Sequence, residues 1–490
     1  MISISNILLV TLAFGLPGLA CAASRGRSGG GSSPPRAPAD RGRDAAGAAT
    51  MGTMALPAAM VEVASASLGA LEARKWRLPN GLEIVLVPDA RATSVSYTTW
   101  FRVGSRNEDE RGGQTGLAHL FEHLMFTQTK TMPADEFDRA VEAAGGNANA
   151  MTYYDFTAYV DDLPPQELPL AARLEADRMT NLDLRKRQVE TERDVVVEER
   201  LSAVEDSVDG TMDELLFKQA FKAHPYRWPV IGWMKDIKAI THEKAVAFYK
   251  RYYAPNNAVL IIAGNIDPAA TLQLIAREYG PIPAGDPPPP DGALPERAPA
   301  AEVRATLTRP VPADRLVIGF PAPSLGDRDR AAFEVAAEML AGGPSSRLYR
   351  TLVVDKQAAS SVRGDVMATR DPGLYGIWVQ MTKGHVAEQA ERAISDATTA
   401  LAIRPLAAGE LGRAIARLET AFWQRLASSH GRAEALGEFE TAGGGFQNLF
   451  QRAAAYQAVT ADDVKRIAAQ YLATEARSIV VVRPKREERS

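Results

Sequence analysis

A proline-rich segment near the middle of the chain most constrains what this sequence can fold into. Residues 283–300 include four consecutive prolines, Pro287 to Pro290. A segment of this kind is stiff and extended, and it joins neither a helix nor the interior of a sheet. We therefore interpret residues 283–300 as a linker between two domains, residues 71–282 and 301–485, each long enough to bury a core of its own.

Both halves mix predicted strands and helices in blocks rather than in strict alternation, which favours an α+β fold. In the first half, Asn80-Gly81 predicts a tight turn between two strands. The predicted strands are residues 76–78, 82–87, 94–103 and 258–263, and then 315–320, 374–381 and 478–483; the predicted helices are 237–253, 327–340, 386–401 and 409–429. We expect two structurally similar domains, each a mostly antiparallel sheet packed with helices.

The N-terminal residues predict export. Residues 1–22 contain an apolar run that is too short for a convincing membrane span and ends in the small-x-small pattern Ala20-Cys21-Ala22, as in a cleaved signal peptide. Lipid attachment at Cys21 is the alternative. Residues 23–70, which begin with a stretch rich in Gly, Ser, Pro and Ala, are expected to form a disordered linker. These features predict a periplasmic protein with no transmembrane span.

The composition excludes some classes of partner and some kinds of metal site. The 56 basic and 60 acidic residues give a net charge of −4, so the chain lacks the strongly basic surface that nucleic acid requires. Cys21 is the only cysteine, which excludes a disulfide framework and a thiolate zinc site. Any metal must therefore be bound by His, Asp or Glu, and with only six histidines in the chain, two that lie close together are informative.

The segment His119-Leu120-Phe121-Glu122-His123 is such a case. Its neighbours are good helix formers, and on a helix His119 and His123 project from one face, one turn apart, so that both imidazoles can reach one ion. Glu122 would lie beside the metal and accept a proton from a water molecule there. The pattern is the inverted H-x-x-E-H motif of zinc peptidases.

A catalytic zinc needs a third protein ligand and an open position for water. The acidic, predicted helical run from Thr191 to Arg200 offers candidates. Glu192 and Glu199 are seven residues apart and therefore lie two turns apart on one face. Spacing alone does not choose between Glu198 and Glu199.

The motif, the acidic run and the 76-residue gap from His123 to Glu199 resemble the insulinase/pitrilysin family of zinc metallopeptidases, and in particular its half-length, mitochondrial-processing-peptidase-like bacterial branch. The resemblance covers about residues 71–485 and includes the segments 112–117, 145–150, 224–226, 264–267 and 342–348. It implies one Zn²⁺ per chain, held by His119, His123 and Glu199.

The resemblance also implies roles for other residues. Glu122 would be the catalytic base, and Glu192 an acid that steadies one of the histidines from behind. Asn149 and Ala150 match an edge strand along which the family binds the substrate backbone. The implied activity is hydrolysis of peptide bonds in peptides or unfolded segments.

The chain departs from the family in its second half, which has no H-x-x-E-H motif and is expected to be an inactive homologous domain. Family members with a complete site carry an Arg and, seven residues on, a Tyr that bind the substrate carbonyl. Val353 and Ser360 occupy these positions here. Val has no donor and Ser is too short to replace a phenol.

We therefore expect a heterodimer with a homologous subunit that supplies the Arg and Tyr, and a homodimer is the second possibility. A non-catalytic structural or presenting subunit is the alternative function. Such relatives typically lose zinc ligands, whereas this chain retains all three together with Glu122.

Overall fold

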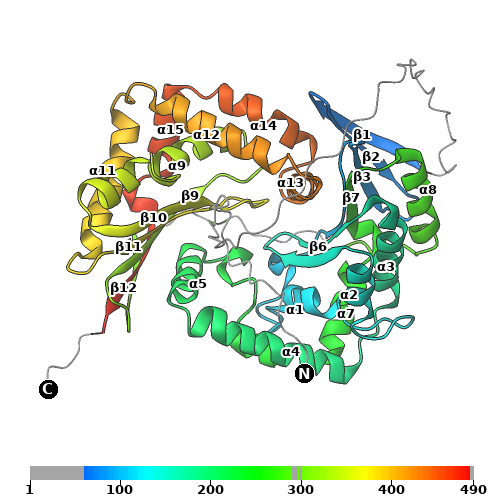
Figure 1. Ribbon diagram of the computed structural model, residues 1–490. Helices are drawn as coiled ribbons and strands as arrows, with labels where there is room; N and C mark the ends of the chain where they lie inside the picture. The colour runs from blue at the N-terminus through cyan, green and yellow to red at the C-terminus, as the bar shows by residue number, and fades with distance from the viewer. Residues whose placement is uncertain (1–59, 290–295, 297–300, 486–490) are drawn as a thin grey trace, which may run out of the picture.

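The computed structural model describes residues 60–289, 296 and 301–485, which form two sheets covered by helices (Figure 1). In the N-terminal half, residues 60–289, the strands are β1 (Val61–Leu68), β2 (Leu71–Arg77), β3 (Glu83–Pro88), β4 (Val95–Phe101), β5 (Asn147–Thr152), β6 (Thr157–Leu163) and β7 (Ala258–Gly264). Its helices are α1 (Leu117–Leu124), α2 (Glu136–Ala143), α3 (Leu168–Asn181), α4 (Lys186–Arg200), α5 (Val208–Ala220), α6 (Met234–Lys238), α7 (His242–Tyr252) and α8 (Pro268–Tyr279).

The C-terminal half, residues 301–485, has a smaller sheet, which is also packed with helices. Its strands are β8 (Val303–Arg309), β9 (Arg315–Ala322), β10 (Ala359–Val366), β11 (Gly373–Met381) and β12 (Ser478–Pro484). Its helices are α9 (Arg330–Ala341), α10 (Arg347–Tyr349), α11 (Ala387–Ile403), α12 (Glu410–Arg425), α13 (Ser429–Thr441), α14 (Gln447–Gln457) and α15 (Ala461–Tyr471).

The strand order is β1-β2-β3-β7-β4-β6-β5 in the first sheet and β10-β11-β9-β12-β8 in the second. Neighbouring strands are antiparallel except for the pairs β3–β7 and β12–β8. The prediction of an α+β fold with two mostly antiparallel sheets is therefore confirmed. Strands β5 and β10 each lie at the edge of their sheet, which leaves one side of each backbone free of strand partners.

The predicted hairpin around Asn80-Gly81 is present as β2 and β3, with Trp76 opposite Ile84. Gly81 has a φ of 89°, a left-handed value that favours glycine. Asn80 Nδ2 donates to the carbonyl oxygens of Tyr279 and Ile282 at 2.8 and 2.9 Å. The turn thus holds the chain at the point where α8 ends.

Folded sequence begins earlier than we predicted. Strand β1 pairs with β2 from Val61 to Leu68, so the assignment of residues 23–70 to a disordered linker is wrong for residues 61–70. The physical reason is a period-two pattern, in which Ala64, Ala66 and Leu68 face a hydrophobic cluster under the sheet. The predicted signal peptide, Cys21 and most of the proline-rich linker lie outside the described residues.

One predicted helix is split in two, and another ends earlier than expected. The helix predicted at 237–253 is split into α6 and α7, because Thr241 caps a new helix by accepting the Lys244 N–H at 3.3 Å. The helix predicted at 409–429 ends at Arg425, and Ser428 caps α13 in the same way through the Gly431 N–H at 3.0 Å. Several elements were not predicted: β6 and helices α2, α3, α5 and α8 in the first half, and β8, β10, α10 and α13 to α15 in the second.

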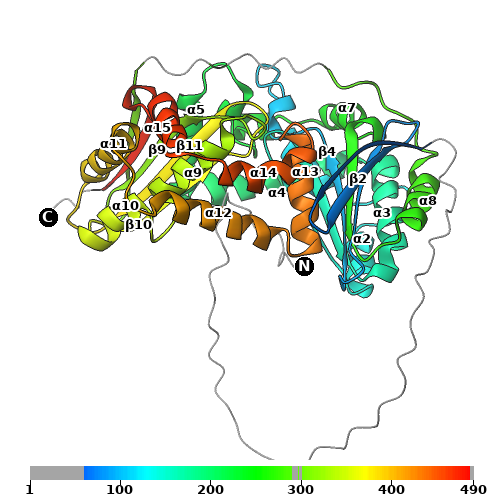
Figure 2. The same ribbon diagram turned by 90° about the horizontal axis from the view of Figure 1, so that it is seen from above.

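Each half of the chain places a helix on the other half's sheet (Figure 2). Helix α5 packs Met212, Leu216 and Phe217 in one cluster with residues of β9 and β12. Helix α13 packs Leu436 and Phe439 in another cluster with Trp100 of β4 and with β7. The exchange joins the two halves through buried apolar surface, which is the main favourable term in folding. Within the described part of the chain, no helix is long and apolar enough to cross a membrane.

Candidate metal centre and active site

Helix α1 carries the histidine motif on a firmly anchored turn. Its apolar face, which includes Leu117, Leu120, Phe121 and Leu124, is buried in the N-terminal core. The buried carboxylate of Glu108 accepts the N–H groups of Gly116 and Ala118 at 2.9 and 2.8 Å, so it satisfies donors at the start of the helix. Burial raises the pKa of Glu108 well above its usual value. Sequence reasoning did not find this residue, because a single Glu in a loop carries no pattern.

Helix α4 brings the acidic residues to the histidines. Val189 and Val196 bury its apolar side, and Glu199 points toward α1. Glu199 Oε1 lies 3.7 Å from His119 Nε2, and Glu199 Oε2 lies 3.3 Å from His123 Nε2. One potential ligand atom from each of His119, His123 and Glu199 falls within 4.8 Å of the others. The fold thus chooses Glu199 over Glu198, which is exposed to solvent.

These three residues fit a divalent cation. Two imidazoles and one carboxylate are a ligand set that zinc uses in catalytic sites. The buried atom Glu199 Oε2 has no hydrogen bond of good geometry, although it lies near His123 Nε2. A buried carboxylate oxygen without a donor is costly, and a cation between the three side chains would remove that cost.

The electrostatics of His119 and Glu199 favour metal binding, whereas His123 would release a proton when it binds a metal. Burial lowers the pKa of His119, which keeps its imidazole neutral and able to bind a metal. Burial also disfavours the charged form of His123, but the close contact with the Glu199 carboxylate and the negative charges of Glu122 and Glu192 together outweigh burial and raise its pKa. Burial opposes ionisation of Glu199 too, yet the interactions with His123 and His119 together lower its pKa. The carboxylate is therefore held in the charged form that a cation requires.

Glu192, on the same helix as Glu199, lies close to His123. Its Oε2 atom is 4.0 Å from His123 Nδ1, the nitrogen that faces away from Glu199. Gln188 donates to the other oxygen of Glu192 at 3.0 Å. Burial raises the pKa of Glu192. The geometry suits a carboxylate that orients a histidine ring from behind.

A cavity of about 570 Å³ opens beside these residues. Glu122, His119 and Glu199 form part of its wall, and Glu122 lies one turn along α1 from His119. The rest of the wall comes from both halves of the chain; it includes Tyr153 and Phe156 near β5, Asp365 in β10, and Phe422 and Phe439 in α12 and α13. The candidate base therefore faces a space that an extended peptide can enter.

Strand β5 occupies the predicted edge position, and Ala150, Met151 and Thr152 line the cavity. Asn149 is exposed. The N–H of Ala150 donates to the side chain of Asn149 at 2.9 Å rather than to a strand partner. A backbone donor satisfied only by a neighbouring side chain remains available for pairing with an added strand.

Val353 and Ser360, which the resemblance matches to the family's Arg and Tyr, do not line the cavity. Val353 is in the short helical segment 350–355 and packs against the C-terminal core. Ser360 is exposed at the start of β10 and donates to the carbonyl oxygen of Gln380 at 3.2 Å. Neither is among the described residues that line the cavity.

Together, the two α+β halves and the inverted histidine motif define the zinc-metallopeptidase type of fold and site. The chain belongs to the insulinase family of peptidases, M16. The model of the insulinase domain, "Insulinase (Peptidase family M16)", matches residues 83–232, and that of the "Peptidase M16 inactive domain" matches residues 239–418.

Similar proteins and solved structures are named as proteases or peptidases. It is 31% identical over 305 residues to the zinc protease PqqE of Helicobacter pylori, a match that covers 61% of this chain and 67% of that protein. It is 26% identical to the mitochondrial-processing peptidase subunit beta of Blastocladiella emersonii, over 83% of this chain and 88% of that one. The crystal structure of a protease from Helicobacter pylori superposes with a TM-score of 0.82 at 27% identity, over 85% of this chain and all of that one.

Proposed function

We propose that this chain is a zinc-dependent peptidase that cleaves peptides or unfolded segments. The observation that carries the proposal is the convergence of His119, His123 and Glu199, with ligand atoms within 4.8 Å of one another, on the wall of a cavity that Glu122 also lines. Family membership supports the same reading, because the relatives named above are proteases.

The residues around the candidate metal centre would bind the metal, transfer a proton and hold the substrate. His119, His123 and Glu199 would hold the ion, and Glu192 would fix the ring of His123 through its Nδ1 side. A bound zinc ion supplies an electrophile for the scissile carbonyl and lowers the pKa of a water molecule toward about 7. The Glu122 carboxylate accepts a proton from the attacking water and returns it to the leaving amine. Strand β5 holds the substrate backbone through its free edge near Asn149 and Ala150.

We further propose that this chain is the catalytic subunit of a heterodimer. The resemblance matches Val353 and Ser360 to an Arg and a Tyr that bind the substrate carbonyl, and neither lines the cavity. Loss of one preorganised donor of this kind costs about 3 kcal/mol in transition-state stabilisation. A homologous partner that supplies both donors would restore it, whereas a homodimer would repeat the defect in each site.

The experiment measures cleavage of an internally quenched peptide by the full chain, alone and with a co-expressed homologous subunit. We expect weak cleavage alone, strong cleavage with the partner, and loss of cleavage with a chelator. Glu122→Gln should lower kcat/KM by about 10²- to 10⁴-fold while zinc stays bound. Glu198→Gln, which changes an exposed neighbour of Glu199, is the matched control and should be unchanged.

Two results would contradict parts of this account. Full activity of the chain by itself would exclude the need for a partner. Bound zinc with cleavage unaffected by Glu122→Gln would exclude Glu122 as the base, and zinc without cleavage under any condition would favour a structural or presenting subunit.

A further inference from the structure

The turn that joins β5 to β6 is held by hydrogen bonds to the backbone of the segment that follows β4. Ser105 N–H donates to the Tyr153 carbonyl at 3.2 Å, and Arg106 N–H donates to the Tyr154 carbonyl at 2.9 Å. The two segments approach so closely at Gly104 that an added Cβ there would lie 2.4 Å from the Tyr153 oxygen. The position of the turn, and with it the end of the edge strand β5, is thus fixed from outside the sheet.

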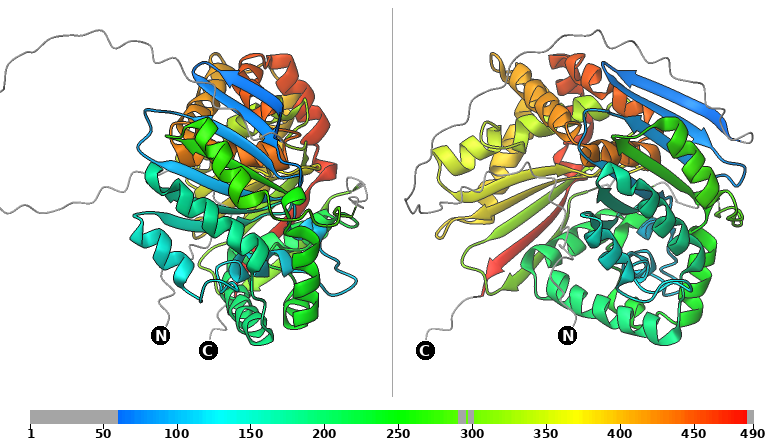
Figure 3. Two further views of the ribbon diagram at one scale, coloured as in Figure 1. Left: turned by 90° about the vertical axis from the view of Figure 1, so that its right-hand side faces the viewer. Right: turned by 45° about the vertical axis from the view of Figure 1, so that its right-hand side comes forward.

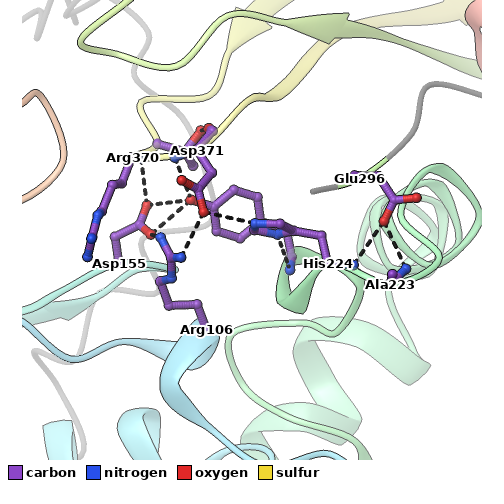
Figure 4. A network of polar contacts seen from close by, with 9 residues as sticks. Arg106, Asp155, Ala223, His224, Glu296, Arg370 and Asp371 are labelled. Atoms are coloured by element: carbon purple, nitrogen blue, oxygen red, sulfur yellow. Dashed lines mark hydrogen bonds and ion pairs between the residues drawn. The ribbon is translucent and has the colours of Figure 1, made fainter. Parts of the chain in front are cut away.

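Asp155 at this turn is a buried carboxylate with donors on both oxygens (Figure 4). Arg106 Nη1 donates to Oδ1 at 2.9 Å, and the Tyr226 hydroxyl lies 2.8 and 2.9 Å from the two oxygens. The fourth contact comes from the other half of the chain, because the Arg370 N–H donates to Oδ2 at 3.0 Å. A charge this deeply buried is held only while its donors stay in place.

Asp371, which follows Arg370 in the sequence, makes further contacts between the two halves. It accepts a hydrogen bond from Arg106 Nη2 at 2.7 Å and lies 3.0 Å from His224 Nε2. Its own N–H donates to the Tyr226 hydroxyl at 3.1 Å. Arg106 therefore bridges Asp155 of the N-terminal half and Asp371 of the C-terminal half. Glu296 holds His224 on the far side by accepting its backbone N–H at 2.9 Å.

Asp371 lies in the loop between β10 and β11, directly after the second edge strand at the cavity. Residues Gly364 to Val366 at the end of β10 and Tyr153 and Tyr154 after β5 all line that cavity. The polar cluster of Arg106, Asp155, His224, Tyr226 and Asp371 thus joins the ends of the two edge strands. In the right-hand view of Figure 3, the yellow-to-red C-terminal half lies beside the blue-to-green N-terminal half.

We propose that Asp371 is a positioning residue, which acts through Arg106 and Asp155 to set where the edge strand β5 lies for pairing with substrate. The inference rests on the proposed function, since it takes β5 as the strand that binds substrate. An edge strand is held by one neighbour only, here β6, so a fixed end matters more for it than for a central strand. Substrate binding at β5 thereby depends on a contact made by the C-terminal half.

The test uses the full zinc-loaded chain with Asp371→Ala, and with Asp371→Asn as a milder variant that preserves side-chain size. Hydrogen–deuterium exchange should become about tenfold faster for residues 147–157 in Asp371→Ala, and by less in Asp371→Asn. In peptide cleavage, KM should rise about tenfold with little change in kcat, because binding geometry rather than chemistry is altered.

Asp89→Asn is the matched control, because Asp89 forms another ion pair between the halves, with Arg432 at 2.8 Å, away from the β5 turn. It should leave exchange at residues 147–157 and KM unchanged. Unaltered exchange in both Asp371 variants would overturn the inference, as would an equal increase in Asp89→Asn or a fall in kcat at constant KM. If exchange changes as expected but the wild-type chain neither cleaves nor binds peptide, the link to β5 stands and the proposed function alone fails.

Discussion

At the scale of single residues, the candidate metal centre depends on which nitrogen of each imidazole faces inward. His123 presents Nε2 to Glu199 and Nδ1 to Glu192, so one ring has an acid on either side. The four-residue spacing of the histidines predicted their shared face, because a helix turn fixes that relation locally. Adjacent residues on a helix differ by about 100° in direction, and only the packing of α4 against α1 decides that Glu199, not Glu198, points at the histidines.

Glu192→Gln tests the acid behind His123. Removal of its charge should weaken zinc affinity about 10- to 100-fold without loss of the fold, because the ring of His123 loses the group that orients it. Zinc affinity is measured by competition with a chromophoric chelator. Asp194→Asn, at an exposed position on the same helix, is the control. Equal zinc affinity in wild type and Glu192→Gln would contradict this role.

Other residues of the site carried no signal in the sequence. Glu108 caps α1, and Arg106 and Asp155 fix the turn after β5, but each is a single charged residue in a loop. Their importance comes from burial and from partners that are distant in the chain, such as Asp371. Local spacing rules do not reach such contacts.

At the scale of elements, a glycine in α13 and a glycine in α12 differ in how closely neighbouring atoms pack against them. Gly437 of α13 faces the indole of Trp100, and an added Cβ would lie 2.0 Å from Trp100 Cε2. Gly412 of α12 is also helical, but an added Cβ there would meet no atom within 4 Å. The two positions differ in packing rather than in backbone conformation.

This pair predicts opposite effects of the same substitution. Gly412→Ala should stabilise the protein by about 0.5 to 1 kcal/mol, because alanine restricts the unfolded chain and favours helix. Gly437→Ala should destabilise it by about 1 to 3 kcal/mol, because the methyl group forces α13 away from Trp100. Chemical denaturation followed by circular dichroism measures both. Stabilisation by Gly437→Ala would show that α13 does not pack this closely.

Element boundaries were predicted less well than element types. The strong signals, such as the Asn80-Gly81 turn and the buried strand β7, are confirmed. The break before α7 was missed although Thr241 is a favourable capping residue, because the apolar pattern continues across it. Strand β1 was missed because its residues are small and weakly apolar.

At the scale of the whole molecule, the two halves are not independent units. The largest core of each half is built from that half alone, but helix α5 covers the second sheet and α13 covers the first, so two further apolar clusters contain residues from both sides of the linker. The linker predicted two domains, but this exchange is not visible in the sequence, since an apolar helix face does not reveal which sheet will cover it. The cavity beside the candidate metal centre lies where the halves meet.

An ion pair between the halves predicts a pH dependence of stability. His430 of α13 lies 2.8 Å from Asp162 of β6, and this contact, together with one to Glu434, raises the pKa of His430 to about 10. A histidine whose pKa is raised on folding stabilises the protein fully below its unfolded value of about 6.5. That contribution is then lost as the pH rises toward 10.

His430→Gln should therefore melt at a lower temperature than wild type at pH 6, and the difference should disappear by about pH 10. The effect is expected to be modest, because the side chain is partly exposed. Thermal melting of both proteins across this pH range measures it. A difference that stays constant from pH 6 to pH 10 would show that protonation of His430 is not its cause.

The proposed peptidase activity requires one metal ion held between α1 and α4. The most direct test is the zinc content of purified full-length protein and its variants, measured by native mass spectrometry. We predict one zinc ion per chain in the wild type, in Glu122→Gln and in Glu198→Gln, and none in His119→Ala or Glu199→Gln. Wild-type protein without zinc, or Glu199→Gln protein with its zinc retained, would contradict the account.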